Sequence, residues 1–260
     1  MNLGLSGKVA IVTGGTKGIG RAIVDELLAE GAAVAFCARN ADEVAAVTQE
    51  LGGEGQPIYG AVADVTDTAA IGVFVDDAVA ALGTVDILVN NAGRAHPGGF
   101  DTLTDADWQA DVDVKLYSMV RCTRAVLPYM RSRGAGRVIN INAVYGKGPD
   151  PAFFATSVVR AACLSLTKTL SIELAPEGIL VNSVNIGYVQ TPQWDNVHAL
   201  RAPEVDREEF FARSAHAVVP MDRFGRPDEV SGLVVFLAGQ RSSYITGASI
   251  DVAGGMGNYL

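Results

Sequence analysis

The sequence predicts an α/β fold in which a doubly wound sheet of seven parallel strands is flanked by helices. Short runs rich in β-branched residues alternate with longer segments of helical period along the chain. A glycine-rich turn follows the first of these runs. Because a helix between two strands returns the chain to the same edge of the sheet, the alternation implies parallel strands joined by right-handed crossovers.

Each expected element follows from this alternation. The predicted strands are residues 9–12, 34–37, 58–62, 85–89, 138–141, 180–184 and 249–252. The predicted helices lie near residues 18–30, 40–51, 67–82, 104–132, 155–175 and 226–239. The longest irregular stretch, 187–220, follows the sixth strand, where substrate loops usually lie in such folds, so we expect it to form a lid.

Length and composition favour a folded protein of one domain over residues 1–260. The sequence is 49% hydrophobic and 19% charged, unlike disordered chains, and its apolar runs are too short to cross a bilayer. The first apolar run enters a glycine turn and is not a signal peptide, so we expect a cytoplasmic protein.

Charge and cysteine content exclude several classes of partner. The 29 acidic and 20 basic residues give a net charge of −9, which repels nucleic acid and anionic membranes. Cys37, Cys122 and Cys163 lie in apolar segments without metal-ligand spacing, so we expect reduced, buried thiols and no metal site. A small molecule remains as the expected partner.

The glycine-rich turn reads Thr13-Gly14-Gly15-Thr16-Lys17-Gly18-Ile19-Gly20 and leads into a helical pattern. Glycines allow a tight turn and let backbone N–H groups approach a pyrophosphate at the helix N-terminus. A plain strand-to-helix turn is the alternative. The strand before and the helix after favour the dinucleotide site of a Rossmann fold.

The spacing of this turn resembles the short-chain dehydrogenase/reductase family, and the resemblance extends over nearly the whole chain. The further matching stretches are Asp64-Val65, Asn90-Asn91-Ala92-Gly93, Val181-Asn182, Tyr244-Ile245-Thr246-Gly247 and Gly254-Gly255. The resemblance implies an oxidoreductase with a nicotinamide cofactor. It also implies a homotetramer, in which the long helical segments 104–132 and 155–175 pair across a two-fold axis.

The same resemblance implies the cofactor-binding residues. The pyrophosphate would lie on Gly14, Thr16, Lys17, Gly18, Ile19 and Gly20. Asp64 and Val65 would flank the adenine, and Asn91, with Ala92 and Gly93 after it, would hold the adenosine ribose region. Thr191 matches the threonine that contacts the nicotinamide amide in the family, and Arg160 would bind the nicotinamide ribose.

The second predicted strand ends in Cys37-Ala38-Arg39-Asn40, without the acid that would bind a ribose 2′-hydroxyl. Arg39 and Lys17 could instead donate charge-assisted hydrogen bonds to a 2′-phosphate. The alternative is that both residues are ordinary surface cations. The sequence therefore predicts NADP(H) as cofactor.

The residues that transfer protons in the family are all replaced. Family members use a Tyr-x-x-x-Lys pair, an earlier serine and an asparagine on the preceding helix. Thr156 stands at the tyrosine position, Arg160 at the lysine, Ala143 at the serine and Lys115 at the asparagine. Alanine has no donor, a threonine hydroxyl is a weak acid and arginine stays protonated. Either the chemistry differs from ordinary ketone reduction or there is none.

Five cations are expected around one cleft that would attract an anionic substrate. They are Arg94, His96, Lys115, Lys147 and Arg160. Less specific interpretations remain for each of them. Asp111 and Lys115 could form a surface pair, Arg160 could bind only ribose, and Arg94 or His96 could be solvated.

Lys115, Lys147-x-Pro149 and the missing tyrosine resemble the atypical family branch that contains the bacilysin-pathway conjugate reductase. Conjugate reduction suits these residues, because hydride goes to carbon and a cation can stabilise the enolate. Lys115, rather than Thr156, is the expected proton donor, with Tyr145 second. A like charge at Arg160 and burial would lower the pKa of Lys115.

The sequence leaves three functions open. The first is an NADPH-dependent reductase of an activated C=C or iminium bond in an anionic small molecule. The second is a non-redox enzyme on the same scaffold, such as a lyase, isomerase or cyclase. The third is a catalytically silent NADP(H)-binding protein. Fold alone does not separate them.

Overall fold

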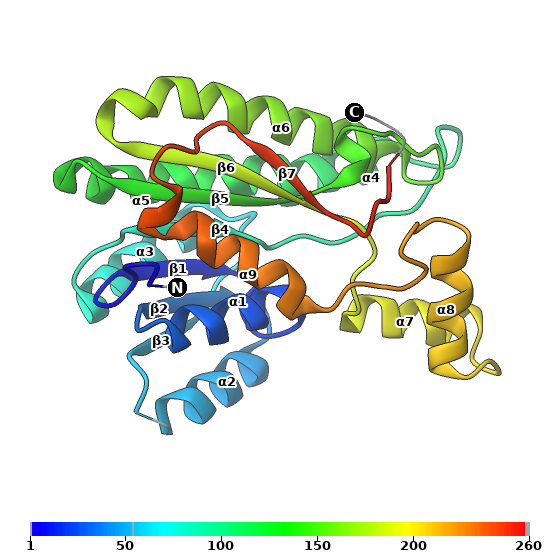
Figure 1. The fold of residues 1–260 in the computed structure, drawn as a ribbon, viewed down its shortest axis with the longest axis horizontal. Helices are drawn as coiled ribbons and strands as arrows, with labels where there is room; N and C mark the ends of the chain where they lie inside the picture. The colour runs from blue at the N-terminus through cyan, green and yellow to red at the C-terminus, as the bar shows by residue number, and fades with distance from the viewer. Residues whose placement is uncertain (1, 54, 258–260) are drawn as a thin grey trace.

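The computed structural model describes residues 2–53 and 55–257, which build a central sheet of seven parallel strands (Figure 1). The strands are β1 (Val9–Thr13), β2 (Ala33–Ala38), β3 (Ile58–Val62), β4 (Ile87–Asn90), β5 (Gly136–Ala143), β6 (Ile179–Ile186) and β7 (Ser249–Val252). Their order in the sheet is β3-β2-β1-β4-β5-β6-β7. The chain reverses its direction of travel between β1 and β4, which is where ligands bind in open α/β sheets. The predicted fold class is confirmed.

Helices cover both faces of the sheet (Figure 1). One face carries α1 (Gly18–Ala29), α2 (Ala41–Gly53) and α9 (Pro227–Ala238). The opposite face carries α3 (Thr68–Leu82), α5 (Ser118–Arg133) and α6 (Phe154–Leu174). No described helix is both long and apolar enough to cross a membrane.

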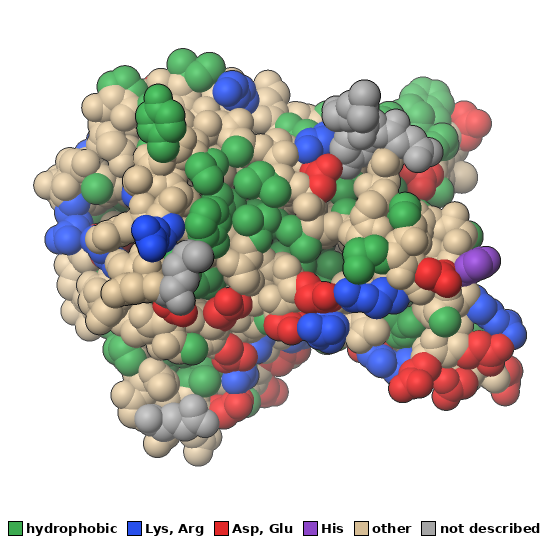
Figure 2. Space-filling model, viewed as in Figure 1, with side chains coloured by type: hydrophobic (Ala, Val, Ile, Leu, Met, Phe, Trp, Pro, Cys, Tyr) green, Lys and Arg blue, Asp and Glu red, His purple; other side chains and the backbone are tan. Residues whose placement is uncertain are grey.

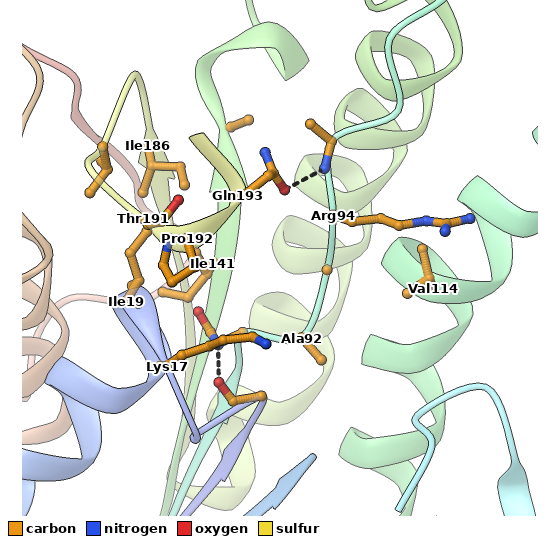
Figure 3. Close-up of a pocket in the computed structure, with 18 of the residues that line it drawn as sticks. Lys17, Ile19, Ala92, Arg94, Val114, Ile141, Ile186, Thr191, Pro192 and Gln193 are labelled. Atoms are coloured by element: carbon orange, nitrogen blue, oxygen red, sulfur yellow. Dashed lines mark hydrogen bonds between the residues drawn. The ribbon is translucent and has the colours of Figure 1, made fainter. Parts of the chain in front are cut away.

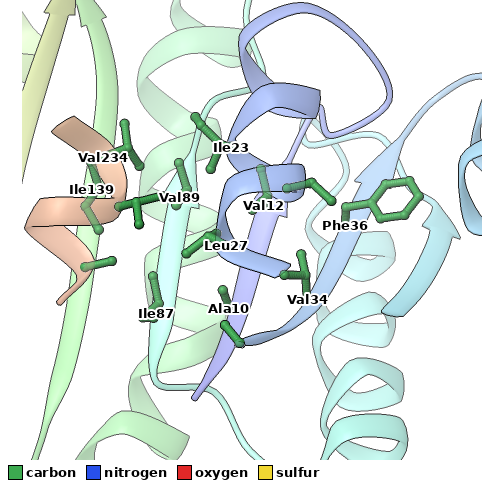
Figure 4. Close-up of a cluster of buried hydrophobic side chains, with 14 of the residues drawn as sticks. Ala10, Val12, Ile23, Leu27, Val34, Phe36, Ile87, Val89, Ile139 and Val234 are labelled. Carbon is green, nitrogen blue, oxygen red and sulfur yellow. The ribbon is translucent and has the colours of Figure 1, made fainter. Parts of the chain in front are cut away.

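The core is formed by strands that are buried on both faces. Figure 4 shows Val12 of β1 and Val89 of β4 packed against Ile23 of α1 and Val234 of α9. The next residue along β1, Ile11, points to the other face and packs in the second core. Alternate side chains of a strand therefore fill two hydrophobic layers. Because all the paired strands are parallel, their carboxyl ends lie along one edge of the sheet.

Residues 104–132 are helical as expected, but they do not form one regular helix. The segment consists of α4 (Asp105–Asp111), a π-helical turn η1 (Val112–Tyr117) and α5. Thr104 caps α4 in a capping box with Asp107. Such π-helical turns are rare and often lie at functional sites. Here the turn carries Lys115 into the interior, where the side chain is fully buried.

The stretch 187–220 was expected to be irregular, and this was wrong. It contains α7 (Pro192–Arg201) and α8 (Arg207–His216), which extend beyond the carboxyl ends of the strands (Figure 1). These two helices form an arm, and acidic and basic side chains are interspersed over it (Figure 2). An aromatic cluster inside the arm holds it together and consists of Tyr188, Trp194, Phe210, Phe211 and Phe224.

Candidate active site

A cleft opens at the carboxyl ends of the strands, between the glycine-rich turn, the ends of β2 to β6 and the start of α7 (Figure 3). Every residue that the family resemblance assigns to the cofactor lines this cleft. These residues are Gly14, Thr16, Lys17, Gly18, Ile19, Gly20, Arg39, Asp64, Val65, Asn91, Ala92, Gly93, Arg160 and Thr191. Segments far apart in the sequence thus meet at the switch point of the sheet.

The glycine-rich turn needs its glycines for physical reasons. Gly14 and Gly18 have positive φ angles of 70° and 57°, which side chains rarely adopt. A Cβ at Gly20 would lie 2.0 Å from the carbonyl oxygen of Gly14. The glycines therefore let the turn fold tightly against the start of α1, and the turn leads into the N-terminus of this helix, whose dipole favours anions.

Asn91 braces this turn. Its Nδ2 donates hydrogen bonds to the carbonyl oxygens of Thr13, at 2.9 Å, and Gly14, at 3.1 Å. Asn91, which the family resemblance placed at the adenosine ribose region, therefore uses its side-chain amide nitrogen to hold the glycine-rich turn.

An acid that the sequence analysis missed lies near the expected 2′-phosphate site. Glu43, in the first turn of α2, accepts a hydrogen bond of 2.6 Å from Lys17 Nζ and one of 2.9 Å from Thr16 Oγ1. These bonds hold the pKa of the Glu43 carboxyl below its usual value. Lys17 is thus already paired, whereas Arg39 lies exposed at the rim of the cleft. Spacing along the sequence does not show that α2 turns Glu43 toward Lys17.

The replaced catalytic positions form a buried hydrogen-bonded network. Lys115 Nζ lies 2.5 Å from Asp111 Oδ2 and 2.8 Å from Thr156 Oγ1. Lys115 and Asp111 are both fully buried, and Thr156 is 4% exposed. Thr156 Oγ1 lies 3.1 Å from Asp111 Oδ2 and 3.3 Å from the backbone carbonyl oxygen of His96. Since the threonine oxygen accepts from the lysine, its hydroxyl hydrogen is available to another acceptor.

The electrostatics of this network lower the pKa of Lys115 to about 8. Burial is the largest cause, because it disfavours the ammonium, and the positive charge of Arg160 acts in the same direction. Asp111 opposes both effects. The sequence suggested that Asp111 and Lys115 could form a surface pair, and this was wrong, because the pair lies in the interior.

Arg160 lies in the wall of the cleft and keeps unused hydrogen-bonding capacity. Its Nη1 donates to the carbonyl oxygen of Ile141 at 2.9 Å, while its Nε is buried without a hydrogen-bond partner in the described structure. Burial lowers the pKa of Arg160 from its ordinary value. A buried donor without a partner is costly, so the position of this guanidinium is not explained by its hydrogen bonds within the protein.

The five cations expected around one cleft do not all reach it. Arg94 and Arg160 line the cleft, but Lys115 and His96 lie behind its wall. Lys147 points elsewhere, because its Nζ donates to Asp251 Oδ1 at 2.7 Å and to the carbonyl oxygen of Ser249. The sequence could not resolve this, since it shows charge but not the direction of a side chain.

Tyr145, the second expected proton donor, lines the cleft in an apolar setting. Its ring stacks on Phe153 with a centroid distance of 5.0 Å, and its hydroxyl lies 3.4 Å from that of Tyr188. Burial raises the pKa of Tyr145. A raised pKa makes the phenol a weaker acid than an ordinary tyrosine. Thr156, unlike Tyr145, is hydrogen-bonded to the buried Lys115.

Comparison with known proteins places the chain in a family. Residues 8–201 match the family model described as short chain dehydrogenase. A putative ketoacyl reductase of the monensin polyketide synthase from Streptomyces virginiae is 40% identical, over 97% of this chain and 98% of the relative.

Two similar solved structures hold NADPH. One is a short chain oxidoreductase from Pseudomonas aeruginosa PAO1, described as containing an atypical catalytic center, with a TM-score of 0.92, 36% identity and coverage of 97% and 98%. The other is L-sorbose reductase from Gluconobacter frateurii with NADPH and L-sorbose, with a TM-score of 0.94, 30% identity and full coverage of both chains. The chain belongs to the short-chain dehydrogenase/reductase family of oxidoreductases.

Proposed function

We propose that this chain is an NADPH-dependent reductase of a C=C bond conjugated to a carbonyl or iminium group in a small anionic molecule. The observation that carries the proposal is Thr156 in the wall of the cleft, whose hydroxyl is hydrogen-bonded to the buried Lys115 and Asp111. This arrangement replaces the tyrosine of the family with a donor that an ammonium supports from the interior.

The cleft fits NADP(H). The glycine-rich turn would hold the pyrophosphate. Arg39 and Lys17 would bind the 2′-phosphate, and Lys17 would give up its hydrogen bond to Glu43 to do so. Arg160, which lines the cleft, would lie beside the nicotinamide ribose. Solved relatives with NADPH support the same cofactor.

NADPH, when bound, supplies the hydride. Thr156 then turns its hydroxyl hydrogen from Asp111 toward the oxygen on which negative charge develops, and Lys115 keeps donating to the threonine oxygen. Because a conjugate reduction leaves an enolate, hydrogen bonding and nearby positive charge stabilise the product of hydride transfer without a phenol. Full protonation takes the ammonium proton of Lys115 through Thr156.

The remaining lining of the cleft supports a flat, anionic substrate. Tyr145, Phe153, Tyr188 and Trp194 give it an aromatic wall. Such a wall accommodates a planar conjugated group. Arg94 also lines the cleft and would attract a carboxylate.

Acetylacrylate and levulinate test this proposal as a matched pair, because the two acids differ only in the C=C bond. With NADPH deuterated at the transferred position, we expect one deuterium on carbon in the levulinate formed from acetylacrylate, and little turnover of levulinate itself. Because reduction of the carbonyl group of acetylacrylate would give a hydroxy acid of the same mass, NMR spectroscopy, which locates the deuterium, distinguishes the products. Faster reduction of levulinate to a hydroxy acid would favour ketone reduction, as the name of the ketoacyl reductase relative suggests.

Two other outcomes identify the remaining functions. Turnover of either acid without oxidation of NADPH would favour a non-redox enzyme on this scaffold. Tight NADPH binding without any turnover would favour a silent NADP(H)-binding protein.

A further inference from the structure

We propose that His96 takes up protons from solvent and passes them through Asp111 to Lys115, which recharges the proton donor after each turnover. This inference rests on the proposed reductase function. It assigns proton-transfer roles to His96 and Asp111, neither of which lines the cleft.

The first observation is a pair of buried polar atoms that face each other. Nδ1 of His96 lies 3.4 Å from Oδ1 of Asp111. Both atoms are buried, and neither makes a hydrogen bond in the described structure. Buried polar atoms without a partner are costly, and a small rotation of either side chain would join these two. A proton on His96 Nδ1 or on Asp111 Oδ1 would therefore allow a hydrogen bond between these two atoms.

The second observation is a route from this pair to solvent. Nε2 of His96 lies 3.4 Å from Oδ1 of Asp107, whose side chain is 37% exposed. The other oxygen of Asp107 accepts hydrogen bonds from the backbone N–H and the hydroxyl of Thr104. The capping box of α4 thus fixes Asp107 with one oxygen toward the imidazole. His96 itself is 21% exposed, so its ring lies between solvent and the interior.

The third observation is that Asp111 uses its two oxygens on opposite sides. Oδ1 faces His96, while Oδ2 accepts from Lys115 at 2.5 Å. A carboxyl group that takes up a proton on one oxygen can rotate about its Cβ–Cγ bond and release that proton on its other side. Together with the 2.8 Å bond from Lys115 to Thr156, the contacts form a continuous path from the surface to the cleft.

The protons balance along this path. During reduction the substrate gains one hydride and one proton, and the proton leaves Lys115 through the Thr156 hydroxyl. Lys115 is then a neutral amine. An imidazolium at His96 gives its Nδ1 proton to Asp111 Oδ1, and rotation of the protonated carboxyl group then brings this proton to the neutral Lys115, which takes it. His96 regains its proton from water, so solvent supplies one proton per turnover.

The charged groups that face His96 and Lys115 come from α4, from the loop of His96 and from α6. His96 faces Asp107 and Asp111 of α4, and Arg94 of its own loop acts on Asp107. Lys115 is influenced by Asp111 and by Arg160 and Cys163 of α6. Burial and the positive charge of Arg160 favour loss of the Lys115 proton, so Lys115 can give up a proton and take one back.

Separate measurements of the first and later turnovers test the relay, with acetylacrylate as the probe and His96→Gln as the variant. Lys115 is already charged before the first turnover. We therefore expect a single-turnover rate within about twofold of wild type and a steady-state rate lowered roughly tenfold or more. Added imidazole should restore the steady-state rate. The matched control is His216→Gln, because His216 lies on the exposed arm and pairs with Asp222.

If His96→Gln lowers the single-turnover and steady-state rates equally and imidazole restores neither, His96 has a structural role and the relay is overturned. A second measurement uses no substrate. In the complex with NADP⁺, the His96 ring signals are followed by NMR as pH is varied. Lys115→Met removes the cation that competes for Asp111, so the His96 titration should move up by at least about half a pH unit.

Asp111→Asn should move the same titration down, because it removes the carboxylate beside Nδ1. Unchanged His96 titration in both variants would overturn the relay whatever the activity. Wild-type protein that never oxidises NADPH would instead count against the proposed reductase, so the two failures are distinguishable.

Discussion

Lys115 reaches the cleft only through Thr156, because its Nζ is fully buried and donates a 2.8 Å hydrogen bond to the threonine oxygen. From the sequence we expected Lys115 to act on the substrate in place of Thr156. The geometry makes the two residues successive members of one path. Loss of either should then impair proton delivery, whereas the sequence alone led us to expect a mild effect for Thr156.

The first prediction concerns the pH dependence of turnover. Lys115 must be protonated to deliver a proton, and its pKa is lowered to about 8 by burial and by Arg160. Turnover of acetylacrylate at saturating NADPH should therefore fall as pH rises above about 8. Lys115→Met should lower turnover by roughly two powers of ten and abolish this decline.

Lys147→Met is the matched control for that variant, because Lys147 pairs with Asp251 outside the cleft. We expect it to keep the wild-type pH profile. A pH profile of Lys115→Met that superimposes on the wild-type one would exclude Lys115 as the titrating group.

The second prediction concerns stability. The pKa of Lys115 is about 8 in the folded protein and 10.5 in its ordinary environment. Between these values the unfolded chain binds more protons than the folded one, so the free energy of unfolding rises with pH. The contribution is at most about 1.4 kcal/mol per pH unit. Urea denaturation at a series of pH values measures it.

Lys115→Met should remove this contribution from the pH dependence of unfolding. The comparison between the two proteins is needed because other lysines and tyrosines titrate in the same range. Identical slopes for wild type and variant would mean that Lys115 keeps an ordinary pKa in the fold.

The third prediction concerns cofactor choice. Arg39→Ala should weaken NADPH binding roughly tenfold to 100-fold and leave NADH binding nearly unchanged, because only NADPH carries the 2′-phosphate. Glu43→Gln should tighten NADPH binding, because it releases Lys17 from the 2.6 Å ion pair. Fluorescence titration of both cofactors measures these affinities. NADH binding that equals NADPH binding in the wild type would contradict our interpretation of this site.

The fourth prediction concerns assembly, for which we propose a homotetramer. The outer face of α6 exposes Val158, at 51%, and Ile172, at 67%. Figure 2 shows hydrophobic side chains along the upper edge of the molecule, where α6 lies in Figure 1. Burial of such a face against another copy would be favourable. Light scattering should give a tetramer for wild type and smaller species for Ile172→Glu. A wild-type monomer at micromolar concentration would contradict the proposal.

Much of the fold could be predicted from the sequence, because hydrophobic period and glycine spacing are local signals. The strands and the glycine-rich turn follow from residues such as Val12 and Gly14, whose roles depend on neighbours along the chain. α7 and α8 were missed because charged residues dominate α8 and its packing face is an aromatic cluster from distant segments.

The site could be predicted only in part. The replaced positions were evident, and so was the spacing of Asp111 and Lys115. Their burial depends on the π-helical turn, whose direction no sequence period indicates. The contacts of His96 with α4 and of Glu43 with Lys17 join separate loops and helices, so they require the assembled fold.

Turnover of acetylacrylate by Thr156→Val and Thr156→Ser, with NADPH affinity measured for both, tests the central claim most directly. Valine keeps the shape of the side chain and removes the hydroxyl that joins Lys115 to the cleft, while serine keeps the hydroxyl. We predict that Thr156→Val lowers kcat by at least about two powers of ten at unchanged NADPH affinity, and that Thr156→Ser retains most of the activity. Full activity of Thr156→Val would contradict the account.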